Sequence, residues 1–176
     1  MGKPVTSKTV ESAVSSFGER TKGKLANVGA SGQPEDQLRS PFESLLQDMA
    51  VLTALTGVVE AVGESSVASL KTRPDYAVTV QNALVGFVEL KAPGKGADPR
   101  KFKDPHDKDQ WERLRSLPNL LYTDGNSFSL WQNGELACPV LSLIGDVESS
   151  GKKLMSPPGF AALFGANPTL VLPAAK

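Results

Sequence analysis

Apolar side chains between residues 38 and 52 recur every three or four positions, which is the period of an amphipathic α-helix. They are Leu38, Phe42, Leu45, Leu46, Met49 and Leu52. Pro34 suits a first helical turn, where its missing N–H is not needed. Pro41 interrupts the pattern, because proline inside a helix removes a hydrogen bond. We therefore expect a helix that begins after Gln33 and restarts near Ser40, with Pro41 in its first turn.

Most of the other apolar positions follow the composition and alternation of β-strands. The segments are 58–62, 76–80, 84–90, 119–123 and 128–131, followed by an apolar run over 136–144. Short turn sequences separate neighbouring strands: Gln81-Asn82, Asp124-Gly125-Asn126 and Asn133-Gly134.

A second helix is predicted over 108–117, where Trp111, Leu114 and Leu117 have helical spacing. The order of helix, strands, helix and strands predicts a mixed α/β domain over 34–148.

The segments on either side of this domain have a different composition. Residues 1–33 are rich in Ser, Thr, Gly and Lys. Val10, Val14 and Phe17 mark a short helical face there, but we expect residues 1–33 to be a mobile or loosely packed arm. Prolines and small residues dominate the end of the chain, so we expect residues 149–176 to form a tail or linker without regular structure.

Charge and cysteine content exclude several classes of protein. The 176 residues include 19 basic and 19 acidic side chains, so the chain lacks the uniformly basic surface of a protein that coats nucleic acid. The single cysteine, Cys138, excludes an internal disulfide and a cysteine-rich zinc site. No apolar run approaches the about 20 residues of a membrane span, and no signal-peptide pattern is present. We expect a soluble, cytoplasmic protein with no membrane partner.

Three ionic residues lie at the ends of the first predicted hairpin. Glu89 and Lys91 are two positions apart, so both project from one face of the sheet, while Leu90 points into the core on the other. The hairpin brings Asp75 back beside the end of its partner strand. Carboxylates in otherwise apolar strands are costly unless they are paired, and Mg²⁺ is a natural partner for their oxygens. The alternative is a salt-bridge cluster on an exposed face of the sheet.

Pro74-Asp75, followed after thirteen residues by Glu89-Leu90-Lys91, resembles the motif of the PD-(D/E)xK nuclease superfamily. The likeness covers about residues 34–135, and the region looks like the N-terminal nuclease domains attached to methyltransferase or translocase modules in bacterial restriction–modification enzymes. The resemblance implies an α/β, restriction-endonuclease-like fold with a mixed central sheet flanked by helices.

The resemblance also implies a metal-dependent deoxyribonuclease with Mg²⁺ as cofactor, for which Mn²⁺ can substitute. Its metal ligands would be Asp75, Glu89 and the backbone carbonyl of Leu90. Lys91 would hold or deprotonate the attacking water and counter the charge on the phosphate. Gln110 on the second helix would orient Lys91 or a DNA phosphate.

The family also has an acidic residue on the preceding helix, which Glu43 matches best. Glu43 would hold a second metal or an outer-shell water, and Glu35 in the first turn is the competing acid. For Glu43 and Gln110 the alternative is an ordinary polar residue on a solvated helix face.

The loop after the second strand of the hairpin is a candidate for contacts with the DNA backbone. Its basic residues are Lys95, Arg100, Lys101 and Lys103. The alternative is a simple solvated loop. Gly94-Lys95-Gly96 lacks the pattern of an ATP-binding loop, and the single histidine, His106, is poor evidence for zinc.

Together these features predict a Mg²⁺-dependent DNA endonuclease domain of a restriction–modification or phage-defence enzyme, acting on double-stranded DNA. Target choice would come from methyltransferase, translocase or recognition modules in the same chain or in partners, and dimerisation would allow double-strand cleavage. Two alternatives remain. One is a non-catalytic DNA- or protein-binding module with a nuclease fold, and the other is a stand-alone repair or junction nuclease.

Overall fold

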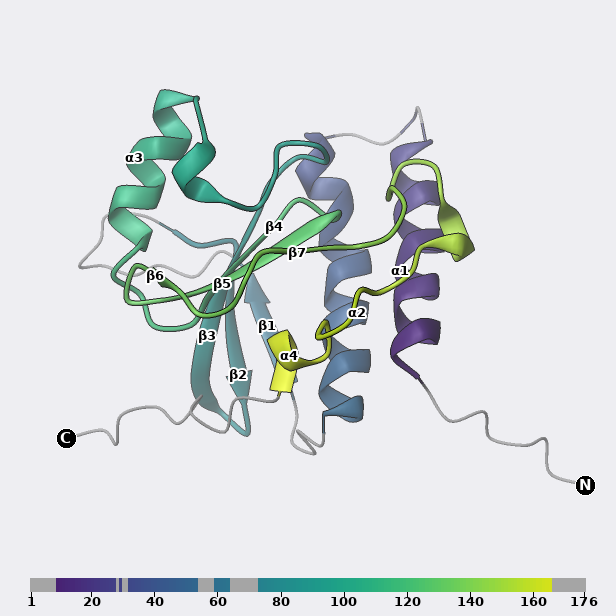
Figure 1. Ribbon diagram of the computed structural model, residues 1–176, viewed down its shortest axis with the longest axis horizontal. Helices are drawn as coiled ribbons and strands as arrows, with labels where there is room; N and C mark the ends of the chain where they lie inside the picture. The colour runs from purple at the N-terminus through teal and green to yellow at the C-terminus, as the bar shows by residue number, and fades with distance from the viewer. Residues whose placement is uncertain (1–8, 28, 30–31, 54–58, 64–72, 166–176) are drawn as a thin grey trace, which may run out of the picture.

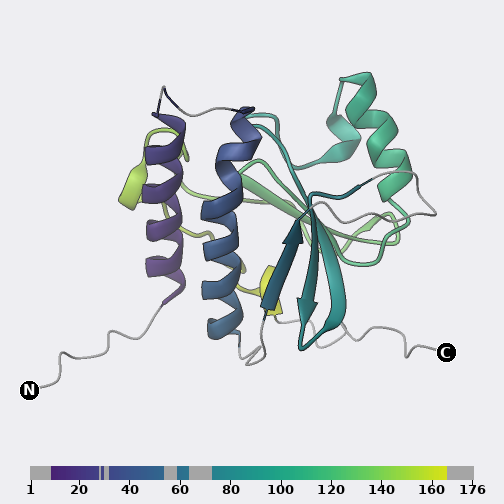
Figure 2. The same cartoon turned by 180° about the vertical axis from the view of Figure 1, so that it is seen from behind.

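A mixed β-sheet lies between helices on its two faces (Figure 1). The structure is a computed structural model that describes residues 9–27, 29, 32–53, 59–63 and 73–165. Helices α1 (Val10–Leu25) and α2 (Arg39–Leu52) lie side by side on one face, and α3 (Pro105–Leu114) lies on the other, as the reverse view in Figure 2 also shows. Within the described ranges, no helix has the length and apolar character needed to cross a membrane.

The sheet has seven strands in the described part of the chain. They are β1 (Val59–Gly63), β2 (Tyr76–Val80), β3 (Ala83–Leu90), β4 (Leu120–Thr123), β5 (Ser127–Gln132), β6 (Glu135–Leu136) and β7 (Leu141–Ser142). The strand order is β1-β2-β3-β4-β5-β6, with β7 paired to β5. Only β3 and β4 are parallel, so the chain between them must cross over one face of the sheet, and this crossover contains α3.

Each face of the sheet has its own apolar core. On the α1 and α2 face, side chains from β2, β3 and β4 pack with the helices, among them Tyr76, Val88, Leu90 and Leu121. On the α3 face, the neighbouring positions of the same strands pack with Trp111 and Leu114, among them Ala77, Phe87 and Tyr122. Leu90 is therefore buried on the face opposite α3, as the alternation of the strand predicts.

Several predicted boundaries are confirmed. A 3-10 turn, η1 (Pro34–Leu38), precedes α2, which begins at Arg39 with Pro41 in its first turn. The predicted turn at Gln81 and Asn82 joins β2 to β3, and both residues have positive φ, of 50° and 65°.

Helix α3 begins three residues before the position that apolar spacing predicts. The side chain of Asp104 accepts hydrogen bonds from the backbone N–H groups of His106 and Asp107, and Pro105 occupies the first helical position. This capping arrangement fixes the start of the helix.

The expectation of a mobile or loosely packed arm is wrong for residues 10–25. They form α1, whose first turn is capped by Thr9 and Ser12. Val14 and Phe17 are almost completely buried against the core on the α2 face. The polar composition reflects the solvent face of an amphipathic helix, which hides a narrow apolar stripe. Residues 1–8, 28 and 30–31 of the predicted arm lie outside the described residues.

The expectation of a tail or linker after residue 148 is also wrong as far as residue 165, although most of this segment is irregular, as predicted. A short turn, η4 (Gly151–Lys153), packs on α1, and a short helix, α4 (Ala162–Gly165), follows. Phe160 is buried and packs edge-to-face on Phe128 of β5, with 5.1 Å between ring centroids. This segment completes the core on that face, and residues 166–176 lie outside the described part.

A single substitution tests whether α1 packs against the segment that follows residue 148. A Cβ atom on Gly18 of α1 would lie 2.2 Å from the carbonyl oxygen of Gly151 and 2.7 Å from Cβ of Leu154. We expect Gly18→Ala to lower the free energy of unfolding by about 1–3 kcal/mol, because backbone must move to admit the methyl group. Urea unfolding measures this change.

The matched control for Gly18 lies on the same helix. A Cβ on Gly23 would meet nothing within 4 Å, so we expect Gly23→Ala to raise the free energy of unfolding by about 0.5–1 kcal/mol through helix propensity alone. If both variants are stabilised alike, α1 does not pack against Gly151 and Leu154.

Candidate functional site

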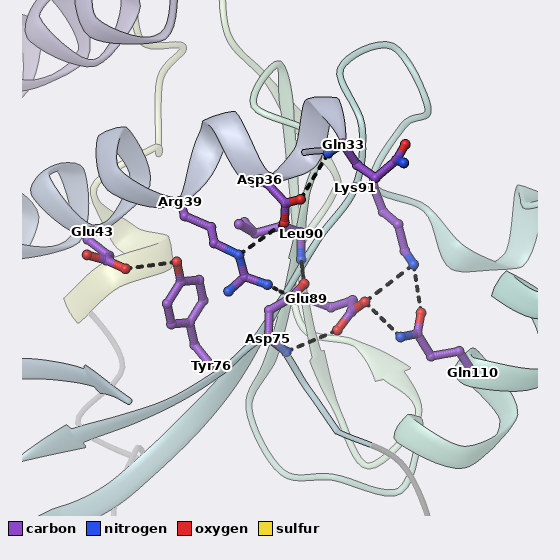
Figure 3. A network of polar contacts seen from close by, with 10 residues as sticks. All are labelled: Gln33, Asp36, Arg39, Glu43, Asp75, Tyr76, Glu89, Leu90, Lys91 and Gln110. Atoms are coloured by element: carbon purple, nitrogen blue, oxygen red, sulfur yellow. Dashed lines mark hydrogen bonds and ion pairs between the residues drawn. The ribbon is translucent and has the colours of Figure 1, made fainter. Parts of the chain in front are cut away.

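The candidate site lies where β2 begins and β3 ends (Figure 3). Tyr76 pairs with Val88 across the antiparallel hairpin, which places Asp75 beside Glu89. The backbone N–H of Asp75 donates to Glu89 Oε2 at 3.3 Å, and the backbone N–H of Leu90 donates to Asp75 Oδ2 at 2.8 Å. The hairpin therefore brings the two predicted carboxylates together.

Lys91 follows β3 and points into the same cluster from the α3 face. Its Nζ contacts Gln110 Oε1 at 2.6 Å, Asp107 Oδ1 at 2.9 Å and Glu89 Oε1 at 3.4 Å. Gln110 Nε2 also donates to Glu89 Oε1, at 2.8 Å. Gln110 thus bridges Lys91 and Glu89, and an ordinary solvated helix position does not describe it.

Helix α3 presents its site residues on the face that packs on the sheet. Asp107 and Gln110 are three residues apart, and the buried Trp111 and Leu114 lie on the same face. Because Trp111 and Leu114 anchor the helix to the sheet, the two polar side chains are held against Lys91.

The electrostatics of the site centre on Glu89. Burial, and next the negative charge of Asp75, raise the pKa of Glu89 to about 7, while Lys91 and the hydrogen bond from Gln110 act in the opposite direction. Tyr122 lies beside Glu89 in the β3–β4 register and is fully buried. Burial and the nearby carboxylates, Glu89 first, raise the pKa of the Tyr122 phenol. Burial is thus the main reason why the charged forms of both side chains are disfavoured.

Arg39 of α2 lies on the other side of Asp75. Its Nη2 donates to Asp75 Oδ1 at 2.7 Å, and its guanidinium group lies over the ring of Tyr76. The Tyr76 hydroxyl in turn donates to Glu43 Oε1 at 2.9 Å. Glu43 is therefore held by Tyr76, and its role in holding a second metal or an outer-shell water stays a prediction (Figure 3). The competing acid, Glu35, lies in η1 and is only partly buried.

Among the described residues, Asp75 and Glu89 are the adjacent carboxylates that would hold a metal ion, and both already accept hydrogen bonds, Asp75 from Arg39 among others. Within the described residues, no group of three or more acidic, histidine or cysteine side chains is arranged to hold one. Asp75 and Glu89 provide hard oxygen donors whose mutual repulsion a cation would relieve, and the main chain of Leu90 is bonded to the same cluster. Mg²⁺ commonly binds one or two carboxylates and keeps several waters. The donor set fits such a hydrated ion.

The loop that follows Lys91 is pinned by a buried carboxylate. Asp124 Oδ2 accepts hydrogen bonds from the backbone N–H groups of Gly94 and Gly96, at 3.2 and 2.8 Å. Both glycines have positive φ, of 89° and 87°, a conformation that residues with a side chain rarely adopt. The loop carries Lys95, which forms an ion pair with Asp107.

The four basic residues predicted to contact DNA differ in their surroundings. Lys95 is paired with Asp107, and Arg100 is paired with Asp98 and stacked over a tryptophan ring. Lys101 and Lys103 are exposed at the end of the same loop.

Sequence reasoning missed two residues of this site, Arg39 and Asp107. Arg39 stands one turn before Glu43 on the same helix, and nothing in the sequence distinguishes it from an ordinary basic residue on a helix surface. Asp107 lies on the apolar face of α3, where an acidic residue is costly unless it has a partner.

Comparisons with known proteins give a likeness of fold. No protein-family model matches the chain, and no curated protein matches it. Among solved structures, a DrdV–DNA complex determined by cryo-electron microscopy matches with a TM-score of 0.52 and 22% sequence identity. The match covers 81% of this chain and only 13% of that chain. The fold predicted from the sequence, an α/β restriction-endonuclease-like sheet flanked by helices, is confirmed.

Proposed function

We propose that this chain is a Mg²⁺-dependent DNA endonuclease domain of a restriction–modification or phage-defence enzyme. The observation that carries the proposal is the convergence of Asp75, Glu89, Lys91 and Gln110 in one hydrogen-bonded cluster at the end of β3. A salt-bridge cluster on an exposed sheet face does not describe it, because Glu89 and Lys91 are only 4% and 6% exposed. Burying these charges is costly, which favours a functional reason for their presence.

A bound Mg²⁺ would neutralise charge on the scissile phosphate and lower the pKa of a water molecule. Asp75 and Glu89 would hold it, with the main-chain carbonyl of Leu90. The protein's own contribution is the placement of Lys91, whose ammonium group has three donors and three acceptors around it. Its contact with Glu89 is the longest of the three. Lys91 can therefore release that contact to hold the attacking water or counter the phosphate charge, while Gln110 and Asp107 keep it in place.

The substrate that fits this site is DNA. The similar solved structure is a DNA complex, and the exposed Lys101 and Lys103 lie on the loop that follows the cluster. Contacts between lysines and phosphates are electrostatic and weaken as salt concentration rises. Lys95 and Arg100 are already paired with Asp107 and Asp98, so in this proposal the exposed Lys101 and Lys103 make the DNA contacts of this loop.

The chain spans 13% of the DrdV chain that it matches, so the activity of a whole enzyme involves much more protein than this domain. We propose that methyltransferase, translocase or recognition modules choose the target, in the same chain or in partners. Dimerisation would place two such sites on opposite DNA strands.

The direct test is to measure metal binding and DNA cleavage by the purified protein. We expect Mn²⁺ to bind in isothermal titration calorimetry, and supercoiled plasmid to be nicked with Mg²⁺ or Mn²⁺ and not with EDTA. Absence of both Mn²⁺ binding and nicking would instead support a non-catalytic module with a nuclease fold. DNA-binding assays would then show whether it still binds DNA.

A further inference from the structure

Asp107 is a buried carboxylate shared by two lysines. Asp107 is 3% exposed, and its Oδ1 accepts a hydrogen bond from Lys91 Nζ at 2.9 Å. Its Oδ2 forms an ion pair with Lys95 Nζ. Asp107 thus contacts the lysine of the cluster from α3.

The charge on Asp107 is maintained by these two partners. Burial alone would raise the pKa of its carboxyl group, but the hydrogen bonds from Lys95 and Lys91 outweigh burial and hold that pKa below its usual value. A buried ammonium group needs a negative partner of this kind, because an unpaired buried charge is strongly destabilising.

The other acceptors of Lys91 cannot replace Asp107. Gln110 is neutral, and Glu89 is shared with Gln110, with the backbone N–H of Asp75 and, in the proposed reaction, with the metal ion. Asp107 is therefore the carboxylate in the cluster that remains committed to Lys91 when a cation occupies Glu89.

The geometry of the loop that carries Lys95 supports the ion pair between Lys95 and Asp107. The side chain of Lys95 is 39% exposed, and its loop is fixed by the hydrogen bonds of Gly94 and Gly96 to Asp124. The main chain therefore places Lys95, the second lysine that pairs with Asp107, next to this carboxylate.

We infer that Asp107 is a positioning residue for DNA cleavage, which acts by holding the Lys91 ammonium group in the geometry that the reaction needs. The inference rests on the proposed function. Asp107 does not touch the reacting atoms in this scheme, so its removal should slow the chemical step and leave metal binding and DNA affinity largely unchanged.

The test compares plasmid nicking by Asp107→Asn and Asp109→Asn. Asp109 is an exposed aspartate on the same helix, paired with Arg113 at the surface, and it serves as the matched control. We expect Asp107→Asn to lower kcat at least tenfold, with KM for DNA and Kd for Mn²⁺ within twofold of wild type. Both kinetic constants of Asp109→Asn should stay within twofold of wild type. Equal kcat values for the two variants overturn the inference.

A second pair of variants separates charge from packing and decides the question if Asp107→Asn does not fold. Glu and Gln at position 107 have the same length and add the same methylene group, but only Glu can pair with the ammonium group. We expect Asp107→Glu to turn over at least fivefold faster than Asp107→Gln. A role in packing alone predicts equal rates for this pair, and that result overturns the inference.

The wild-type protein distinguishes this failure from failure of the proposed function. If wild type nicks plasmid and the substitutions at position 107 leave kcat unchanged, only the role of Asp107 is wrong. If wild type neither binds Mn²⁺ nor nicks plasmid, the proposed function fails and the inference fails with it.

Discussion

Replacement of Lys91 or Asp75 by alanine is expected to abolish Mg²⁺-dependent nicking of plasmid DNA, with a loss of at least about 10²–10³-fold in kcat. The two losses have different causes. Asp75 provides one of the two carboxylates at the cluster, so Asp75→Ala should also lose Mn²⁺ binding. Lys91 provides no metal ligand, so Lys91→Ala should still bind Mn²⁺ while failing to cleave.

Calorimetry and nicking assays on the same preparations measure this difference. Thermal unfolding must show that both variants are folded at the assay temperature, because Lys91→Ala leaves Glu89 and Asp107 with one partner fewer. The surface variant Glu112→Gln is the control for differences between protein preparations, since Glu112 is exposed. Cleavage at the wild-type rate by folded Lys91→Ala and Asp75→Ala would rule out the proposed mechanism.

The sequence predicts the part of this site that depends on local geometry. Alternation along one strand separates Leu90 from Glu89 and Lys91, and a two-residue turn returns the chain so that Asp75 lies near the end of β3. The pairing of Asp75 with Glu89 also requires the register shift between Val78 and Thr79, which the sequence pattern does not predict. These relations hold for any hairpin of this register.

The residues that complete the site depend on tertiary packing. Arg39 reaches Asp75 only because α2 lies on one face of the sheet, and Asp107 reaches Lys91 only because the crossover places α3 on the other. Glu43 is a third example, since its contact with the hydroxyl of Tyr76 depends on how α2 packs against β2. No spacing rule in the sequence predicts that contact.

The ends of the domain were mispredicted because composition averages over a segment. In α1, a few buried side chains such as Phe17 sit among polar residues, so the segment reads as a linker. In residues 151–165, Pro157, Pro158 and Gly159 suggest irregular structure. Irregular structure does form there, but Leu154 and Phe160 are buried by it. Burial of a few large side chains, rather than regular secondary structure, makes both segments part of the core.

The second large effect concerns the stability of the metal-free protein. Glu89 has a pKa of about 7 in the folded protein, compared with an ordinary value of 4.5. Between these two pH values the folded state holds a proton that the unfolded chain has released. The free energy of unfolding should therefore fall as pH rises from about 4.5 to about 7. Above pH 7 the contribution of Glu89 to this free energy no longer changes with pH.

Glu89→Gln removes this titration while keeping the shape of the side chain. We expect wild type to lose on the order of 2–3 kcal/mol more stability than the variant between pH 4.5 and pH 8 in EDTA, because only wild type has this carboxyl group to titrate. Urea unfolding at the two pH values measures the difference, and Glu112→Gln should show no such dependence. Added Mg²⁺ should narrow the gap at pH 8, because an ion bound only by the folded wild type stabilises it by mass action. If Glu89→Gln and wild type lose equal stability between pH 4.5 and pH 8 without metal, the pKa of Glu89 is not raised in the folded protein.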